Sequence, residues 1–235
     1  MEEIIELNNN FFEDFIELLT LKKKIRGKRN EKAPVFYYDS IKPKINFNVQ
    51  TELSKFQIFE IDRSLLSVFG FPAYGVHCNG WQKKGKEYYM VLSKRSEKIK
   101  SFPGLFDNLI GGGQPAKLSF KQNLFKEGYE ETGIDQLSLN KSSFNSFTKY
   151  LLTYKNNFNP SVIATFDLEI KNPLSLNNTD GEIENFKVFH ISEVFELLEN
   201  NKLKPNAIIP IVNFILKRID NFFNASTLSE IKSYL

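Results

Sequence analysis

The chain has 235 residues, of which 41% are hydrophobic, and its formal net charge is only +3. This composition can form a sizeable core, and the small charge argues against a protein that binds nucleic acid. No apolar run approaches the ~20 residues of a membrane-spanning helix, and the acidic start lacks the pattern of a signal peptide. The single cysteine, Cys78, excludes an internal disulfide. We therefore expect a cytoplasmic protein without nucleic-acid or membrane partners.

Residues 1–69 are predicted to form a small N-terminal α/β extension. Apolar spacing indicates a helix at residues 8–21. The apolar and aromatic run at residues 35–38 indicates a strand, and the apolar spacing at residues 61–69 indicates a short helix that ends at Gly70. The basic cluster from Lys22 to Lys32 has no interleaved aromatic residues, so we interpret it as a solvated helix end and linker. Residues 70–235 are predicted to form the main domain.

The main domain is predicted to combine strands, one helix and a helical C-terminal part. Its predicted strands are residues 74–81, 87–93, 147–154, 161–170 and 184–190. Between the second and third strands, residues 107–110 lead into a turn of three glycines, followed by a helix that Gly133 should end. Residues 194–235 read as helical, with an apolar centre at 208–214.

The helix after the glycine turn carries three acids, Glu127, Glu130 and Glu131, at helical positions i, i+3 and i+4. Glutamates on helices are usually a solvated face. Here, however, two of them lie in the last turn, where the helix dipole disfavours acids, and no lysine or arginine follows them three or four residues later. Three close carboxylates repel one another unless a cation lies between them. The cluster predicts a site for Mg²⁺ or Mn²⁺, ions that share oxygen ligands with substrate phosphates.

The order of glycine turn, helix, acid cluster and glycine resembles the Nudix box, G-x5-E-x7-R-E-U-x-E-E-x-G-U, where U is aliphatic. Aligned on Gly133, the box begins at Gly112, and the three acids fall on its metal-binding glutamates. Three positions depart from it: Leu118 replaces the first glutamate, Lys126 the arginine and Gly128 an aliphatic residue. A glycine inside a helix costs about 1 kcal/mol relative to alanine. The sequence gives no reason for Gly128.

The flanks of the box are similar to one Nudix branch, whose members are related to or fused to thiamine pyrophosphokinase. The similar segments are residues 75–81, 93–96, 102–113, 166–169, 180–186 and 203–207. That branch also has a lysine at the arginine position and lacks the first glutamate, whereas residues 1–69 match its N-terminal domain only loosely. The resemblance implies an α+β fold, a Nudix α/β/α sandwich with a mixed sheet, plus the N-terminal α/β extension and C-terminal helices.

The resemblance also implies a hydrolase that splits the diphosphate of thiamine diphosphate, or of its damaged oxo and oxy analogues, into a monophosphate and phosphate. Mg²⁺ or Mn²⁺ would be held by Glu127, Glu130, Glu131 and a backbone carbonyl near Gly112. Two alternatives stay open. One is a Nudix hydrolase of a nucleoside diphosphate derivative such as ADP-ribose, and the other is a Nudix-like module that binds a ligand without turnover. The intact acid cluster favours an enzyme.

Three further residues are candidates for contact with a small-molecule diphosphate substrate. The planar guanidinium of Arg95 could grip a phosphate in two places, although a surface arginine at a strand end is an equal alternative. Trp81 could stack on a thiazolium or pyrimidine ring or lie in the core. Asn108, just before the glycine turn, could reach substrate or shape the loop. The sequence does not decide whether a second copy of the chain joins this one in a homodimer.

Two acids are candidates for the general base, namely Glu130 and Glu182. Glu182 follows an Asp-Gly turn that could place it at the edge of the site, although an ordinary hairpin is the alternative. His77 and His190 each lie in a strand-like apolar run and are not expected to form a catalytic pair. Adjacent strand residues point to opposite faces, so His77 and Cys78 cannot form a dyad directly.

Overall fold

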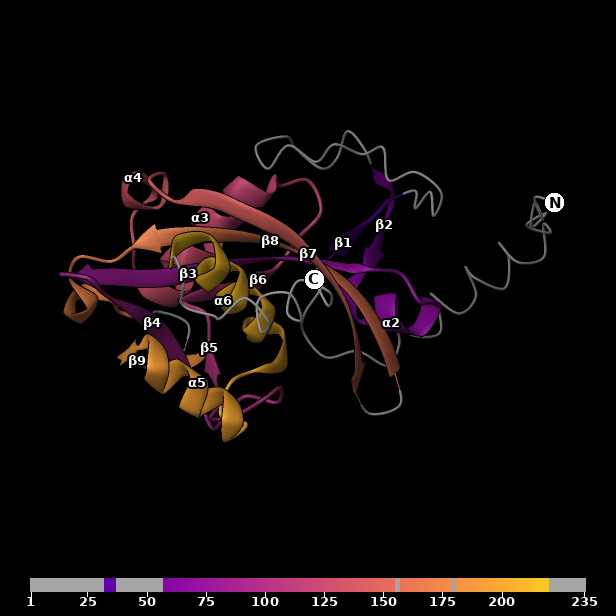
Figure 1. Ribbon diagram of the computed structural model, residues 1–235. Coiled ribbons are helices and arrows are strands. Elements are labelled where there is room, and N and C mark those ends of the chain that lie inside the picture. Colours follow the sequence, from indigo (N-terminus) through magenta and orange to yellow (C-terminus); the bar gives the residue numbers. More distant parts are fainter. Residues whose placement is uncertain (1–31, 37–56, 155–156, 179–180, 220–235) are drawn as a thin grey trace, which may run out of the picture. The chain divides into compact units, whose positions relative to one another are not determined.

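The computed structural model describes residues 32–36, 57–154, 157–178 and 181–219 (Figure 1). The predicted helix at residues 8–21, most of the basic cluster and the chain beyond residue 219 lie outside the described residues. The chain from Lys32 onward forms one compact unit. The predicted domain boundary near Phe69 stays a prediction. In the described part, no helix is long and apolar enough to cross a membrane.

A seven-stranded mixed sheet forms the centre of this unit. Its strands are β3 (Ala73–Lys84), β4 (Glu87–Arg95), β5 (Phe106–Asp107), β6 (Ile110–Gly113), β7 (Ser143–Tyr154), β8 (Asn157–Glu169) and β9 (Ile183–His190). The order across the sheet is β5-β4-β3-β8-β7, with β6 also paired to β3 and β9 to β4. Only the β3–β8 pair is parallel among these described strands. Parallel neighbours need a long crossover, and the segment between them contains the three glycines of β6 and the acid cluster.

Helices cover both faces of the sheet. They are α2 (Leu66–Phe69), α3 (Phe120–Thr132), α4 (Gln136–Leu139), α5 (Ile191–Glu199) and α6 (Pro205–Arg218), with 3-10 turns η2 (Arg63–Leu65) and η3 (Pro173–Ser175). One buried cluster joins Phe120 and Leu124 of α3 to the sheet, and another joins Phe214 and Ile215 of α6 to it. Helices α3 and α6 therefore lie on opposite faces of the sheet (Figure 1), and the predicted α/β/α sandwich with a mixed sheet is confirmed.

Alternation along the central strands supplies the two cores. In β4, Val91 belongs to the α3-side core, whereas Met90 and Leu92 belong to the α6-side core. In β3, Val76 and Cys78 likewise face α3. Both faces of these strands are buried: β4 has a nearly continuous apolar run, whereas buried polar residues alternate with the apolar ones in β3.

The predicted strands of the main domain are all present, and the main differences are on their N-terminal side. The predicted helix at 61–69 is wrong in its first part, since Ile61 belongs to β2 (Gln57–Asp62), which pairs with β1 (Lys32–Phe36). The Asp62 carboxylate accepts the Ser64 N–H at 3.2 Å and so begins η2 instead of continuing a helix. The predicted turn of three glycines is wrong, because Gly111–Gly113 belong to strand β6, which pairs with β3. Elements β5 and α4 went unpredicted because they are too short to show a periodic pattern.

Candidate active site

Helix α3 holds the acid cluster and is fixed at both ends. At its start, the Ser119 hydroxyl accepts the Gln122 N–H at 3.1 Å, and the Gln122 side chain accepts the Ser119 N–H at 2.7 Å. This reciprocal capping satisfies two backbone donors that the first turn leaves open. At its end, Gly133 takes the left-handed conformation, with φ 69°, that stops a helix. The position of the acid cluster relative to both ends of the helix is therefore fixed.

Two of the three acids face the glycine run. Glu131 is 6% exposed, and its Oε2 accepts the Gly111 N–H at 2.8 Å. Burial raises the pKa of Glu131 well above its ordinary range, and the Gly111 hydrogen bond opposes this shift. The Glu127 side chain fills the space that a Cβ on Gly112 would need. A side chain at position 112 would displace Glu127, whose carboxylate lies against the Gly112 backbone.

The third acid, Glu130, is paired with a lysine. Lys126 Nζ lies 3.0 Å from Glu130 Oε2 and 3.1 Å from Glu127 Oε1. Burial lowers the pKa of Lys126, but these two carboxylates outweigh burial and raise the pKa above its ordinary value. The expectation that no local cation relieves the crowding is wrong, because a lysine four residues before an acid reaches it as well as one four residues after.

The donors fit a hard divalent cation without forming a closed cage. Among the described residues, no three His, Cys, Asp or Glu side chains are grouped closely enough to hold a metal ion by themselves. Mg²⁺ usually takes one or two carboxylates and completes its shell with water and substrate phosphates. Glu127 and Glu131, both beside the glycine run, supply such a pair of carboxylates. Glu130 is held by Lys126 through its Oε2.

A cavity of about 180 Å³ adjoins the glycine run, which is β6. The polar side chains that line it are Arg63, His77, Tyr150, Ser161, Lys204 and Asn206. A Cβ on Gly111 would lie 3.6 Å from His77, and a Cβ on Gly113 would take the place of the Arg63 guanidinium. Successive residues of an extended strand face opposite ways. The glycine run therefore has the α3 acid Glu127 against its middle residue and basic side chains around the cavity.

Asp107 holds two cations next to this cavity. The carboxylate is 2% exposed, with Lys204 Nζ at 2.6 Å and Arg95 Nη1 at 3.3 Å from its Oδ2. Burial by itself would raise the pKa of Asp107. The nearby cations, above all Lys204, outweigh burial and lower this pKa below its ordinary value. Arg95 also donates from Nε and Nη2 to the Ser101 carbonyl, at 3.2 and 2.9 Å. Arg95 is thus anchored in the protein, and its role in phosphate binding stays a prediction.

Asn108 belongs to a buried chain of amide hydrogen bonds. Asn79 Nδ2 donates to Asp167 Oδ1 and to the Pro210 carbonyl, each at 2.9 Å. Asn79 Oδ1 is therefore the acceptor for Asn108 Nδ2 at 2.8 Å, and Asn108 Oδ1 is the acceptor for His77 Nδ1 at 2.5 Å. His77 consequently carries its proton on Nδ1. Because Asn108 is fully buried and both ends of its amide are bonded, this geometry favours loop shaping over contact with substrate.

The remaining nucleophile and base candidates are separated by the sheet. His77 joins the amide chain, whereas Cys78 lies in the α3-side core. Burial lowers the pKa of His77 to about 4, so it is neutral, and burial raises the pKa of the Cys78 thiol, so it stays protonated. His190 begins α5 and lies 2.8 Å from Glu87. The structure brings none of these together as a catalytic pair.

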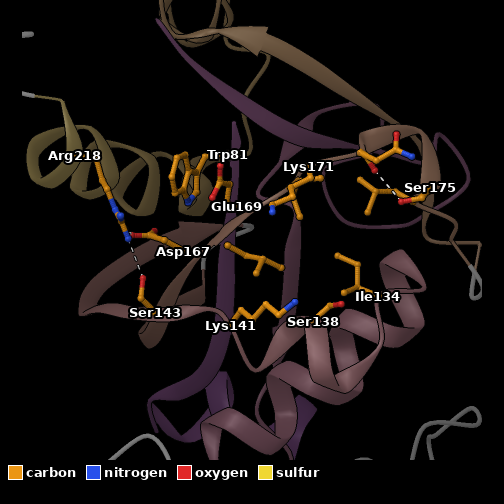
Figure 2. Close-up of a pocket in the computed structure, with 14 residues that line it drawn as sticks. Trp81, Ile134, Ser138, Lys141, Ser143, Asp167, Glu169, Lys171, Ser175 and Arg218 are labelled. Carbon is orange, nitrogen blue, oxygen red and sulfur yellow. Dashed lines mark hydrogen bonds and ion pairs between the residues drawn. The ribbon is translucent and has the colours of Figure 1, made fainter. Parts of the chain in front are cut away.

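Trp81 lies towards the other end of β3, on a second pocket of about 520 Å³ (Figure 2). Its ring packs against Tyr88 and Phe214, and the Arg218 guanidinium lies 5.2 Å from the ring centroid. Six residues of extended strand, roughly 20 Å, separate Trp81 from Gly75, which pairs with the glycine run. The structure does not bring Trp81 to the α3 acids, and substrate stacking on it stays a prediction.

Glu182 lies just before β9. Its backbone carbonyl accepts the Ser96 N–H at 2.9 Å, and the next residue, Ile183, pairs with Arg95. Gly181 has φ 78°, as a glycine turn before a strand requires. Glu182 therefore lies at the same end of the β4–β9 pair as Arg95, and its role as a general base stays a prediction.

Sequence and fold are both similar to Nudix proteins. The chain is 31% identical over 205 residues to Nudix hydrolase 20, chloroplastic, of Arabidopsis thaliana, covering 87% of this chain and 51% of that protein. It is 28% identical over 203 residues to Nudix hydrolase 24, chloroplastic, of the same plant, covering 86% and 52%. The NUDIX domain of Shewanella oneidensis NrtR, solved with ADP ribose, matches with TM-score 0.50 at 13% identity, over 62% of this chain and 88% of that domain. The chain is thus similar in sequence to these Nudix hydrolases, and it has the Nudix fold.

No family model matches the chain. The chain spans about half the length of the curated relatives it matches. The likeness to the NrtR domain is one of fold.

Two of the three departures from the Nudix box, Lys126 and Gly128, have local explanations in this structure, whereas nothing in it explains the leucine side chain at position 118. Lys126, in the arginine position, pairs with two of the box glutamates. Leu118, in the position of the first glutamate, contributes its carbonyl, which accepts Gln114 Nε2 at 2.9 Å. Gly128 is needed for close packing, because a Cβ there would lie 2.7 Å from Leu139 and 3.1 Å from Ile110. A glycine that weakens the helix thus lets α3 approach α4 and β6.

Several residues that line the cavity were not predicted from the sequence as site residues. Lys204 and Asn206 flank Pro205, which begins α6, and Tyr150 comes from β7. Arg63 comes from the turn after β2. The only available signal was the segment 203–207, which is similar to the same branch and contains a proline, Pro205, of the kind that begins a helix. Nothing in the sequence places that helix start beside Gly111.

Proposed function

We propose that the protein is a Mg²⁺- or Mn²⁺-dependent hydrolase of the diphosphate bond in thiamine diphosphate or its oxo and oxy analogues. The observation that carries this proposal is the position of two carboxylates, Glu127 and Glu131, at the backbone of the glycine run. Its relatives named as Nudix hydrolases support the reaction class. The segments that flank the box support thiamine compounds as substrates.

The reaction requires water to attack a polyanion. The water oxygen would form a bond to one phosphorus while the bridging P–O bond breaks, leaving a monophosphate and inorganic phosphate. Bound Mg²⁺ or Mn²⁺ would neutralise the diphosphate and make the attacking water more acidic. Glu127 and Glu131 would hold the ion at the glycine run. Glu130, once released from Lys126, or Glu182 would accept the proton of the water.

A substrate panel tests this proposal. The full chain is incubated with Mg²⁺ or Mn²⁺ and with thiamine diphosphate, its oxo and oxy analogues, ADP-ribose, coenzyme A and nucleoside triphosphates. We expect the highest kcat/KM with a thiamine compound and a monophosphate as product. A preference for ADP-ribose over every thiamine compound would show a hydrolase of nucleoside diphosphate derivatives instead. Turnover of no diphosphate would show a module that only binds its ligand.

The role of Glu130 can be separated from that of its ion pair. We expect Glu130→Gln to lower kcat by at least ~100-fold, because the amide neither binds metal well nor accepts a proton. Lys126→Met breaks the same ion pair but keeps the carboxylate, and should reduce kcat far less. Glu199→Gln, at an exposed position of α5, serves as the neutral control. An unchanged kcat in Glu130→Gln would remove Glu130 from the site.

A further inference from the structure

The cavity beside the glycine run is too small for a whole cofactor-sized ligand. Its volume is about 180 Å³, whereas pockets for complete small-molecule ligands have roughly 300–1,000 Å³. It is lined by all three glycines of β6, whose middle residue contacts Glu127. A ligand group in this cavity would therefore lie next to the backbone that also contacts an α3 acid.

Two cationic side chains, Lys204 and Arg63, line the cavity. Lys204 lines it and is 12% exposed, with its ammonium 2.6 Å from Asp107. The same carboxylate also faces Arg95, so one negative charge is shared between two cations. Arg63 adds a third cation, and its guanidinium lies where a side chain on Gly113 would be. Cationic side chains at the wall of a cavity attract an anionic ligand.

The other polar residues of the cavity add no opposing charge. His77 is neutral, because burial lowers its pKa to about 4. Burial also raises the pKa of Tyr150, so its hydroxyl stays neutral and can donate a hydrogen bond. Asn206 Nδ2 donates to the Tyr150 hydroxyl at 3.2 Å, while Asn206 Oδ1 is buried without a hydrogen-bond partner. Rotating this amide by half a turn would let Oδ1 accept from Tyr150 and free Nδ2 to donate to a ligand.

We propose that this cavity binds a phosphate group of the substrate, with Lys204 and Arg63 as its cationic anchors. This inference rests on the proposed diphosphate hydrolysis and adds to it the residues that hold the substrate. Arginine can donate to a phosphate through two parallel N–H groups, and lysine acts as a point charge. The phosphate in the cavity and the acids of α3 would then hold the diphosphate from the two sides of the glycine run.

Binding of inorganic diphosphate tests the assignment without any turnover. Calorimetric titration of the full chain in metal-free buffer compares the wild type with Lys204→Met and Arg63→Met. We expect each variant to raise the Kd at least tenfold. Lys202→Met, an exposed lysine two residues from Lys204, should leave it unchanged. Lys204→Arg should retain most of the binding because it keeps the charge.

The outcomes separate this inference from the proposed function. Loss of diphosphate binding in both variants supports the cavity even when no thiamine compound is hydrolysed. Hydrolysis with an unchanged KM and unchanged diphosphate binding in both variants overturns the cavity while the proposed function stands. A wild type that binds no diphosphate also overturns it. Should Lys204→Met fail to fold, because Asp107 then keeps only Arg95, the Arg63→Met variant decides alone.

Discussion

Gly112 and Gly113 are glycines for different reasons. Gly112 leaves room for the Glu127 side chain, and Gly113 leaves room for the Arg63 guanidinium. Neither has a positive φ among the backbone values of the structure, so close approach of a neighbour, rather than backbone freedom, requires them. At the scale of single residues, the site depends on the absence of a side chain at these two glycines.

His77 shows how one buried residue can be important without taking part in the reaction. Its Nδ1–H is bonded to Asn108, and its ring lies near Gly111. The residue is 3% exposed. Because burial favours the neutral form of His77, protonation of this residue destabilises the folded protein.

Acidification should therefore destabilise the protein through His77. Its pKa is about 4 in the folded protein, against an ordinary value of 6.5, so the unfolded chain binds more protons between these limits, and stability falls as the pH falls through them. The loss between pH 7 and pH 5 is about 2 kcal/mol. In urea unfolding at the two pH values, His77→Gln should show a decrease smaller by about that amount. Equal decreases in both proteins would contradict a neutral, buried His77.

At the scale of elements, helix α3 combines strong ends with a weak middle. Its capping box and its Gly133 stop fix the helix, while Gly128 lowers its intrinsic stability. The contacts of Gly128 with Leu139 and Ile110 explain this combination. The helix must lie close enough to β6 for its acids to reach the glycine run.

Gly128→Ala should destabilise the protein although alanine favours helices. The added methyl group gains about 1 kcal/mol in helix propensity but overpacks the Leu139 contact, which costs about 1–3 kcal/mol. Thermal unfolding should therefore show a lower Tm. The double variant Gly128→Ala with Leu139→Ala provides the control, because the smaller side chain removes the clash. If Gly128→Ala raises the Tm in the wild-type background, close packing does not explain this glycine.

At the scale of the whole molecule, two separate cores fix the helices on the two faces of the sheet. The α3-side core carries the acids, and the α6-side core carries the start of the helix that supplies Lys204. The glycine run belongs to the sheet between them. The site is therefore assembled by packing on both faces.

Leu124 and Leu137 give a matched test of the α3-side core. Leu124 is fully buried, whereas Leu137 in the neighbouring α4 is 81% exposed. We expect Leu124→Ala to lower the free energy of unfolding by about 2–5 kcal/mol, through lost burial and the cavity left behind. Leu137→Ala should change it by less than about 0.5 kcal/mol. Chemical denaturation measures both, and equal effects would contradict the described packing of α3.

The strands of the main domain and the acid helix could be predicted from sequence because each depends on local spacing. Period-two runs identified β3, β4, β7, β8 and β9, and the helical spacing of Glu127, Glu130 and Glu131 identified α3. The helix predicted from Ile61 failed, because pairing with β1 outweighed the local pattern. The periodicity of a strand's own sequence does not show which other strand it pairs with.

The sequence by itself determined the candidate site: a glycine run followed by a helix with three acids, in the order of a Nudix box. Only the tertiary structure decided that Glu127 and Glu131 face that run while Glu130 pairs with Lys126. It also brought the lysine that precedes α6 beside the same glycines, on a carboxylate 97 residues earlier in the chain. The reason is physical: helical spacing fixes which side chains share a face, but burial and charge pairing depend on what the fold packs against that face.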